Sequence, residues 1–231
     1  MKVAIIIPAY NEASVIFNVI KKISAEIKKN KISADIIVID DGSIDETAKT
    51  AKKAGATVVS HLLNSGAGSA TSTGLDYALI HEYDIAITSD ADGQHLSKDV
   101  VKGIEIMSIS KIDLLIGSRL INPEGMSDVK KLGNKGLSFL TWVLFGVKST
   151  DSQSGLRGYS KKAIRGLRWK SSGFEFCSEM IWRAKESGLI IDEFPISALY
   201  TEYSKSKGQN NWNAINIIKR LLKQRIVEMF E

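Results

Sequence analysis

The chain is poor in the residues that form disulfide bonds or bind metal ions. It has one cysteine, Cys177, which excludes an intramolecular disulfide and a multi-cysteine zinc site. Its three histidines, His61, His81 and His95, lie far apart without metal-ligand spacing. No run approaches the roughly 20 apolar residues that cross a bilayer, and the N-terminus turns polar too early for a secretory signal. We therefore predict a soluble cytoplasmic protein.

What the chain does contain fits a single large α/β domain. Its 231 residues are too few for two ordinary domains, and 44% of them are hydrophobic. A charged fraction of 25% does not indicate disorder.

Charge is distributed unevenly along the chain. Residues 1–128 hold 13 basic and 17 acidic side chains, whereas residues 129–173 hold 10 basic side chains against Asp151 alone. This pattern predicts a phosphate-rich or anionic-membrane partner, or else only solvated lysines on helix surfaces.

Apolar β-branched runs alternate with segments of helical periodicity, which is typical of βαβ units and a mostly parallel sheet with helices on both faces. Predicted strands are Val3–Ile7, Asp35–Ile39, Thr57–Ser60, Asp84–Thr88, Leu114–Gly117 and Leu189–Leu199. Predicted helices are Val15–Ile27, Asp45–Ala54, Ala67–Ile80, Lys98–Met107, Leu132–Val147, Phe174–Ser187 and Asn213–Phe230.

Polar clusters follow the first five predicted strands. They are Pro8–Glu12, Asp40–Ser43 with Asp45 and Thr47, Asn64–Gly68, Asp90–His95 and Gly117–Arg119. Because ligands of parallel α/β sheets bind at the carboxyl ends of the strands, we expect these clusters to form one site.

The cluster after the fourth strand predicts a metal site. Asp90, Asp92 and Gln94 supply oxygen atoms at a spacing that suits Mg²⁺ or Mn²⁺. Asp40 and Asp41, at a neighbouring strand end, add negative charge that a cation would balance. Two weaker interpretations are a haloacid-dehalogenase-type nucleophile at Asp90 and a partial dinucleotide fingerprint at Gly66–Gly68.

Taken together, the motifs resemble family 2 glycosyltransferases of the GT-A fold. The resemblance rests on Pro8–Glu12, Asp40–Thr47, Asp90–His95 and Gly117–Arg119. The segments Asp151–Arg157 and Phe174–Phe176 are similar to the dolichyl-phosphate mannose synthase-like branch, which makes polyprenyl-phosphate sugars. The resemblance covers roughly residues 1–200 and implies a three-layer αβα sandwich.

The resemblance also implies roles for single residues. Pro8, Tyr10 and Glu12 would line the nucleotide pocket, and Asp41 would read the base or ribose. Asp90, Ala91 and Asp92 match the Asp-X-Asp element, with Gln94 as an additional ligand, and Arg119 would contact the diphosphate or the sugar. Gly66, Gly68 and Gly74 match a Gly-rich segment, but the basic residue often beside those glycines is replaced by Ser65 and Ala67.

The implied reaction is an inverting, metal-assisted transfer of a hexose from a UDP- or GDP-linked donor. Its acceptor is a polyprenyl phosphate or a saccharide. A lipid phosphate needs no protein base, whereas a sugar hydroxyl does, and the candidates are Asp151, Glu175 and Glu179. In the segment that holds the acceptor in related enzymes, Lys205 and Lys207 could bind a phosphate.

The C-terminal region leaves two possibilities open. We expect a catalytic domain over residues 1–205 and a basic amphipathic helix within residues 206–231. That helix, with Ile215, Ile218, Leu221, Leu222 and Ile226 on one side, packs on the domain or lies on a membrane. The apolar segment Leu137–Phe145 is a second candidate for membrane contact, which would place the protein at the inner face of the cell membrane.

Two other functions remain as alternatives. One is a catalytically silent nucleotide-sugar binder. The other is a sugar-phosphate nucleotidyltransferase, a class that would require a glycine-rich loop with Arg and Lys near the N-terminus. We expect no nucleic-acid partner.

Overall fold

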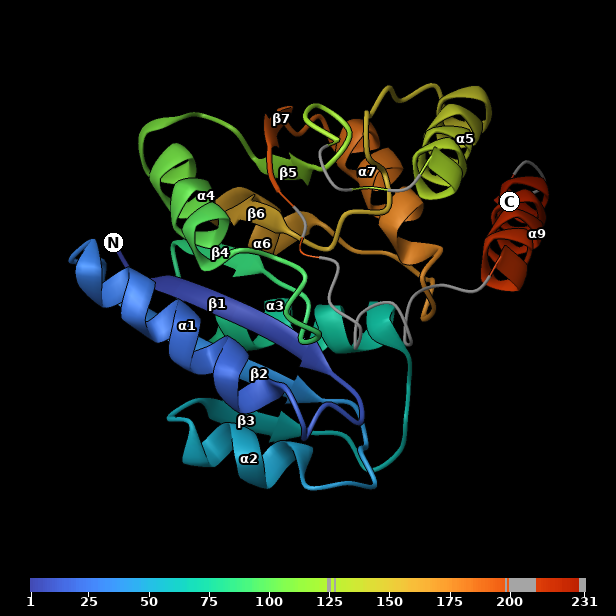
Figure 1. Cartoon of the computed structure of the whole chain (residues 1–231). Helices are drawn as coiled ribbons and strands as arrows, with labels where there is room; N and C mark the ends of the chain where they lie inside the picture. Colours follow the sequence, from blue (N-terminus) through green and yellow to red (C-terminus); the bar gives the residue numbers. More distant parts are fainter. Residues whose placement is uncertain (124–125, 127, 198, 200–210, 229–231) are drawn as a thin grey trace.

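The computed structural model describes residues 1–123, 126, 128–197, 199 and 211–228. Its centre is a seven-stranded sheet in the order β3-β2-β1-β4-β6-β5-β7 (Figure 1). The strands are β1 Val3–Ala9, β2 Ala34–Asp40, β3 Thr57–Ser60, β4 Ile85–Thr88, β5 Leu114–Ser118, β6 Arg157–Ser160 and β7 Ile191–Pro195. The helices are α1 Ile16–Lys29, α2 Thr47–Lys53, α3 Ala67–Ile80, α4 Ser97–Ile109, α5 Asp128–Phe145, α6 Lys161–Gly166, α7 Phe176–Glu186 and α9 Asn211–Glu228.

Two hydrophobic cores, one on each face of the sheet, create the three layers. Alternate residues of β1 point to opposite faces, so Ala4 and Ile6 belong to one core while Ile5 and Ile7 belong to the other. The first core is covered by α3, α5, α6, α7 and α9, and the second by α1, α2 and α4. The predicted three-layer αβα architecture is confirmed.

The sheet is mostly parallel, as predicted, with one exception that the sequence analysis missed. Strand β6 pairs antiparallel with both β4 and β5. It was missed because Arg-Gly-Tyr-Ser carries no apolar run, and the short helix α6 that follows it was missed too. The last strand is also shorter than predicted, since β7 spans Ile191–Pro195.

Helix α9 packs part of its apolar side on the domain. Ile217 and Leu221 are buried in the core that contains Leu137, Phe145 and Trp182. Leu222 of the same helix is half-exposed, and the side chains of Ile215 and Ile226 lie outside the described residues. Within the part of the chain that the structure describes, no helix is long and apolar enough to cross a membrane.

Candidate active site

A cavity of about 670 Å³, hereafter the central cavity, opens at the carboxyl ends of β1, β2 and β4. It brings together most of the residues that the sequence analysis selected. The lining includes Pro8, Tyr10, Glu12, Asp41, Gly66, Asp90, Ala91, Asp92, Gln94 and Arg119 from the predicted clusters. It also includes Val129, Asn134, Leu137, Gln153, Gly155, Arg157, Phe174, Phe176 and Cys177 from the later part of the chain.

The loop after β1 is fixed to the loop after β2 through backbone amides. The Asn11 amide donates to Ser43 Oγ at 2.9 Å, and the Glu12 amide donates to Thr47 Oγ1 at 2.8 Å. Asn11 adopts a left-handed conformation with φ of 55°, which Asn tolerates better than most residues. These bonds hold Tyr10, whose side chain is half-exposed, at the edge of the central cavity.

Asp41 is buried and anchors the loop before α3. Its Oδ1 accepts from the Ser65 amide at 2.9 Å and faces His61 Nδ1 at 2.7 Å, while Oδ2 accepts from the Gly66 amide at 2.8 Å. Asp41 therefore lines the cavity, and its carboxylate already accepts structural hydrogen bonds.

The glycines at the start of α3 permit a close backbone contact. A side chain at Gly66 would overlap with the Ser172 carbonyl, and one at Gly68 would overlap with the Ser171 carbonyl. The Gly68 amide donates to the Ser172 carbonyl at 2.7 Å. The Gly-rich segment thus joins the two halves of the cavity. This close contact explains why glycines stand here, although no basic residue lies beside them.

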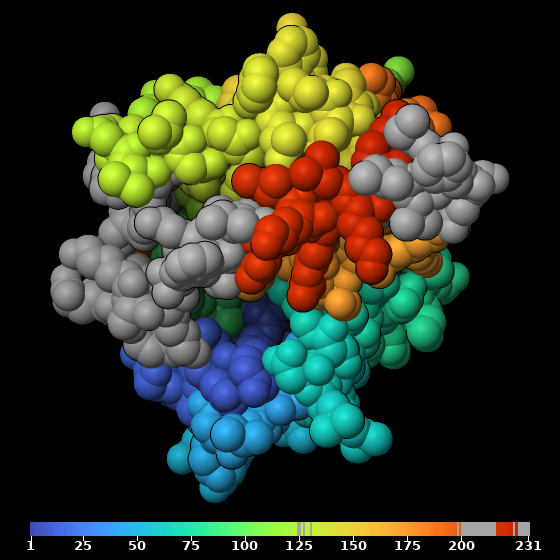
Figure 2. All heavy atoms as spheres, turned by 90° about the vertical axis from the view of Figure 1, so that its right-hand side faces the viewer, coloured from blue at the N-terminus to red at the C-terminus, as the bar shows by residue number. Residues whose placement is uncertain are grey.

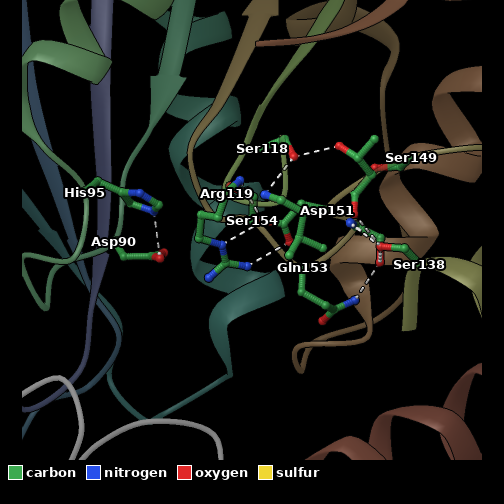
Figure 3. A network of polar contacts seen from close by, with 12 residues as sticks. Asp90, His95, Ser118, Arg119, Ser138, Ser149, Asp151, Gln153 and Ser154 are labelled. Atoms are coloured by element: carbon green, nitrogen blue, oxygen red, sulfur yellow. Dashed lines mark hydrogen bonds and ion pairs between the residues drawn. The ribbon is translucent and has the colours of Figure 1, made fainter. Parts of the chain in front are cut away.

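The acidic cluster after β4 lies at the centre of the site. His95 Nε2 and Asp90 Oδ2 are 2.9 Å apart, and the His95 side chain is buried while 47% of the Asp90 side chain faces open space (Figure 3). The Gln94 amide donates to Asp92 Oδ1 at 2.9 Å, and Gln94 Nε2 donates to Asp92 Oδ2. The three predicted metal ligands are therefore neighbours.

The two carboxylates of this cluster differ in their electrostatic surroundings. Desolvation inside the cavity raises the pKa of Asp90, but the hydrogen-bonded contact with His95 and the positive charges of Arg119 and Arg157 outweigh it and hold that pKa below its ordinary value. Burial, together with the negative charge of Asp90, raises the pKa of Asp92 above its ordinary value. Asp90 is therefore the more readily ionised carboxylate of the pair.

The cluster suits a hard divalent cation. Asp90 and Asp92 offer carboxylate oxygens, Gln94 offers a side-chain carbonyl, and Gly155 leaves room for Asp90, since a β-carbon there would overlap with its Oδ1. Among the described residues, no three His, Cys, Asp or Glu side chains form a closed metal cluster. Mg²⁺ and Mn²⁺ are compatible with such an open set, because phosphates of a substrate fill the remaining positions.

Arg119 lines the central cavity, and an ion pair with Asp151 fixes the orientation of its side chain. Its Nε and Nη2 donate to the two carboxylate oxygens of Asp151 at 2.7 and 2.8 Å, and its backbone amide donates to Oδ2 at 3.1 Å. Asp151 is fully buried and the Arg119 side chain is 13% exposed. A planar pairing of this kind fixes the direction of the guanidinium.

Arg157 is a site residue that the sequence analysis did not select. It is buried on β6, donates to the carbonyls of Ser152, Ser154 and Cys177, and lines the central cavity. Gln153 also lines the cavity, and its Nε2 donates to Ser178 Oγ at 3.0 Å (Figure 3). Both residues lie in the segment Asp151–Arg157, which carries part of the family resemblance. The sequence analysis did not predict the strand β6 that begins at Arg157.

None of the three predicted base candidates, Asp151, Glu175 and Glu179, lines the central cavity. Both Glu179 oxygens accept from backbone amides, those of Lys170 and Ser171, at 2.9 Å, and the side chain is fully buried. Glu175 accepts from Arg220 of α9 at 3.0 Å. The predicted phosphate-binding residues Lys205 and Lys207 lie outside the described residues.

Comparison with known proteins places this geometry in a family. Residues 4–168 match the Glycosyl transferase family 2 domain. An uncharacterized protein of Methanocaldococcus jannaschii is 41% identical over 230 residues, which cover 97% of this chain and 93% of that protein. The UDP-N-acetylglucosamine–dolichyl-phosphate N-acetylglucosaminyltransferase of Methanococcus voltae is 39% identical over 240 residues, 94% of each chain. The undecaprenyl-phosphate mannosyltransferase of Micrococcus luteus is 27% identical over 218 residues, 90% of this chain and 87% of that one.

Solved structures confirm the predicted GT-A fold. Glucosyl-3-phosphoglycerate synthase of Mycobacterium tuberculosis, in complex with Mn²⁺, uridine diphosphate and phosphoglyceric acid, superposes with a TM-score of 0.69 at 20% identity. The superposition covers 97% of this chain and 78% of that one. With the family match over most of the chain, these likenesses lead to one conclusion: the protein is a glycosyltransferase that belongs to glycosyl transferase family 2.

Proposed function

We propose that the protein transfers a hexose from a nucleoside-diphosphate sugar to a polyprenyl phosphate, with inversion at the anomeric carbon. The observation that carries the proposal is the shared cavity, in which Asp90, Asp92 and Arg119 face the same space as an apolar wall of Leu137, Phe174 and Phe176. The relatives named for transfer to dolichyl or undecaprenyl phosphate support this acceptor.

The donor fits the half of the cavity formed by the N-terminal strands. Tyr10 offers a ring for the base, and Pro8, Glu12 and Asp41 complete that pocket. The diphosphate would lie beside the guanidinium of Arg119, in the part of the cavity that the start of α3 also lines. Asp90, Asp92 and Gln94 would hold Mg²⁺ or Mn²⁺, which when bound neutralises charge on the leaving diphosphate. The neighbour crystallised with Mn²⁺ and uridine diphosphate supports this choice of ion.

The state of the three carboxylate candidates favours a phosphate acceptor over a sugar hydroxyl. Asp151 is paired with Arg119, Glu175 with Arg220, and Glu179 with two backbone amides. A hydroxyl nucleophile needs a base within hydrogen-bond reach, whereas a lipid phosphate is already an anion. A phosphate oxygen of the lipid would attack the anomeric carbon while the bond from that carbon to the diphosphate breaks. Arg119 stabilises the negative charge that develops.

The experiment is sugar transfer into the lipid fraction. Labelled UDP- and GDP-sugars are incubated with polyprenyl phosphate, with and without Mn²⁺, and the expected product is a metal-dependent polyprenyl-phosphate sugar. Asp92→Ala should lower turnover by about 10²-fold or more, because it removes charge stabilisation of the leaving group. Asp76→Asn is the matched control, since Asp76 on α3 is a surface carboxylate that forms an ion pair with Arg168.

Three outcomes would contradict parts of the proposal. Release of the nucleotide without a lipid product excludes the lipid acceptor. Donor binding without turnover for every acceptor favours the silent binder. Full activity of Asp92→Ala excludes the metal site.

A further inference from the structure

An ion pair ties helix α9 to the loop that precedes α7. Arg220 Nη1 of α9 donates to Glu175 Oε1 at 3.0 Å. The Glu175 side chain is 8% exposed, whereas the Arg220 side chain is 60% exposed. The pair therefore joins a buried carboxylate to a helix that follows 45 residues later in the chain.

The loop around Glu175 forms part of the wall of the central cavity. Gly173, Phe174 and Phe176 line the cavity, and Glu175 stands between them in the sequence. The Phe176 amide donates to the Gly173 carbonyl at 3.1 Å, and the Ser178 amide donates to the Glu175 carbonyl at 3.1 Å, so the loop turns directly into α7. A contact that holds the Glu175 side chain therefore also holds the turn that presents the two phenylalanines.

Gly173 shows how closely the ion pair lies against this loop. A β-carbon at position 173 would lie 2.6 Å from Glu175 Oε2 and 2.8 Å from Arg220 Nη1. Both distances are shorter than van der Waals contact, so a glycine is needed for the pair to approach the backbone. Gly173 thus contacts the ion pair and lines the central cavity at the same time.

Helix α9 is anchored on the domain by apolar side chains as well. Ile217 and Leu221 are buried in the core that contains Leu137 and Trp182. Figure 2 shows α9 in red beside α5 in yellow and beside the orange segment that leads into α7, and α9 and α5 are in contact. Removal of the charge of Arg220 should therefore release the loop while the helix stays in place.

We infer that Arg220 is a positioning residue, which acts through Glu175 to hold Gly173, Phe174 and Phe176 in the shape that receives the acceptor. The inference rests on the proposed function, in which the phenylalanines of this wall face the lipid. Arg220 is not among the residues that line the central cavity, so its effect passes through Glu175. Glu175 thereby has a role that differs from that of a base.

The test is steady-state transfer to a short, water-soluble prenyl phosphate, with donor and acceptor varied in turn. Arg220→Gln should raise the KM for the acceptor by about tenfold, because two loosened phenylalanine side chains then have to be ordered when the acceptor binds. The KM for the nucleotide sugar and the kcat at saturating acceptor should change by less than about twofold. An ion pair that only attached α9 would not raise the acceptor KM selectively.

Two other substitutions on α9 provide the control and the rescue. Lys219→Gln removes one positive charge from an exposed position next to Arg220 and should leave all three constants unchanged. Arg220→Lys keeps a positive charge. Because the contact with Glu175 runs through a single nitrogen, Nη1, an ammonium can replace it and should restore most of the acceptor affinity.

Two further variants test whether Arg220 acts through Glu175. Glu175→Gln/Arg220→Gln should raise the acceptor KM no further than Arg220→Gln alone, because both substitutions break the same contact. Gly173→Ala keeps both charges but displaces the pair, so it should raise the acceptor KM as Arg220→Gln does. Gly166→Ala, where nothing lies within 4 Å of the added atom, should have no effect.

Hydrogen exchange of the free protein separates this inference from the proposed function, because it needs no substrate. Arg220→Gln should speed the exchange of the backbone amides of residues 173–178 by about tenfold relative to Lys219→Gln, and the amides of β1 should not respond. An unchanged acceptor KM in Arg220→Gln, additive effects in the double variant, or equal exchange in the two single variants would overturn the inference. Absence of transfer by the wild type would count against the proposed function instead.

Discussion

The two walls of the central cavity are built in different ways. The wall of the N-terminal strands consists of short loops, in which backbone amides of Asn11, Glu12 and Gly66 bond to side chains on the neighbouring loop. The other wall consists of buried charged side chains, above all Arg119 on Asp151 and Arg157 on three carbonyls. The first wall is thus held together by bonds of its own backbone, while the second presents cations whose direction is fixed by a buried carboxylate and by backbone carbonyls.

The largest effect on turnover should come from a substitution of Arg119 in the second wall. Arg119→Lys cannot reproduce the two parallel bonds to Asp151, because an ammonium is a point charge without the planar fork of a guanidinium. We expect turnover to fall by about 10²-fold, measured as nucleotide release in the presence of acceptor. Arg168→Lys is the control, since Arg168 forms a half-exposed ion pair with Asp76 at 3.2 Å. Equal turnover of the two variants would show that the orientation of Arg119 is unimportant.

A second variant tests where the two walls meet. In Gly155→Ala the added β-carbon would overlap with Asp90 Oδ1, so the carboxylate has to move. We expect Mn²⁺ affinity, titrated in the presence of uridine diphosphate, to fall by about tenfold or more. Gly166→Ala adds the same atom where nothing lies within 4 Å and should leave the affinity unchanged. Unchanged affinity in Gly155→Ala would mean that Asp90 does not hold the ion.

A third variant separates stability from catalysis in the second wall. Glu179→Gln removes a buried charge that accepts from the Lys170 and Ser171 amides, so the free energy of unfolding should fall by about 1–3 kcal/mol. Turnover of the folded enzyme should persist, because Glu179 does not line the cavity. Glu186→Gln, at a half-exposed carboxylate of the same helix, should change the stability by less than about 0.5 kcal/mol. Loss of turnover with unchanged stability would restore Glu179 as a base.

The smallest effect concerns the strands that support the second wall. Burial raises the pKa of Asp113, but bonds from the Ile190 amide, Ser160 Oγ and Lys162 Nζ outweigh it and hold that pKa below its ordinary value. A pKa that is lower in the folded state contributes stability above the ordinary value of about 3.9, and this stability is lost as the pH falls through the folded value. Asp113→Asn should therefore cost about 1 kcal/mol near neutral pH.

The same variant should flatten the decline of stability in acid, measured by urea unfolding at stepwise lower pH. Parallel pH profiles for the variant and the wild type would rule out this role for Asp113.

The first wall could be predicted from the sequence because its parts are local. Apolar runs indicate β1, β2 and β4, and the polar residues that follow these strands lie at one edge of the sheet. Helix α3 has the predicted bounds Ala67–Ile80. What the sequence did not reveal is that the glycines of α3 serve contact with Ser171 and Ser172, about a hundred residues further on.

The second wall resisted prediction because its chemistry depends on distant partners. Arg157 looks like a surface residue until β6 places it between β4 and β5. Asp151 and Glu179, like Glu175, were base candidates for a hydroxyl acceptor because they are acidic and lie in or near the segments that carry the family resemblance. Only the fold shows that their carboxylates are occupied by Arg119 and by two amides. Sequence patterns report which groups are present, whereas burial and pairing decide what those groups can still do.

The position of β6 has a consequence for synthesis on the ribosome. Strand β4 pairs with β1 on one side and with β6 on the other, although β6 begins about 70 residues later in the chain. A nascent chain that ends before Gly155 therefore lacks half the neighbours of β4 and the residue that shapes the pocket around Asp90. Since contacts of such long sequence separation form late, the central cavity should be completed only after most of the polypeptide has emerged.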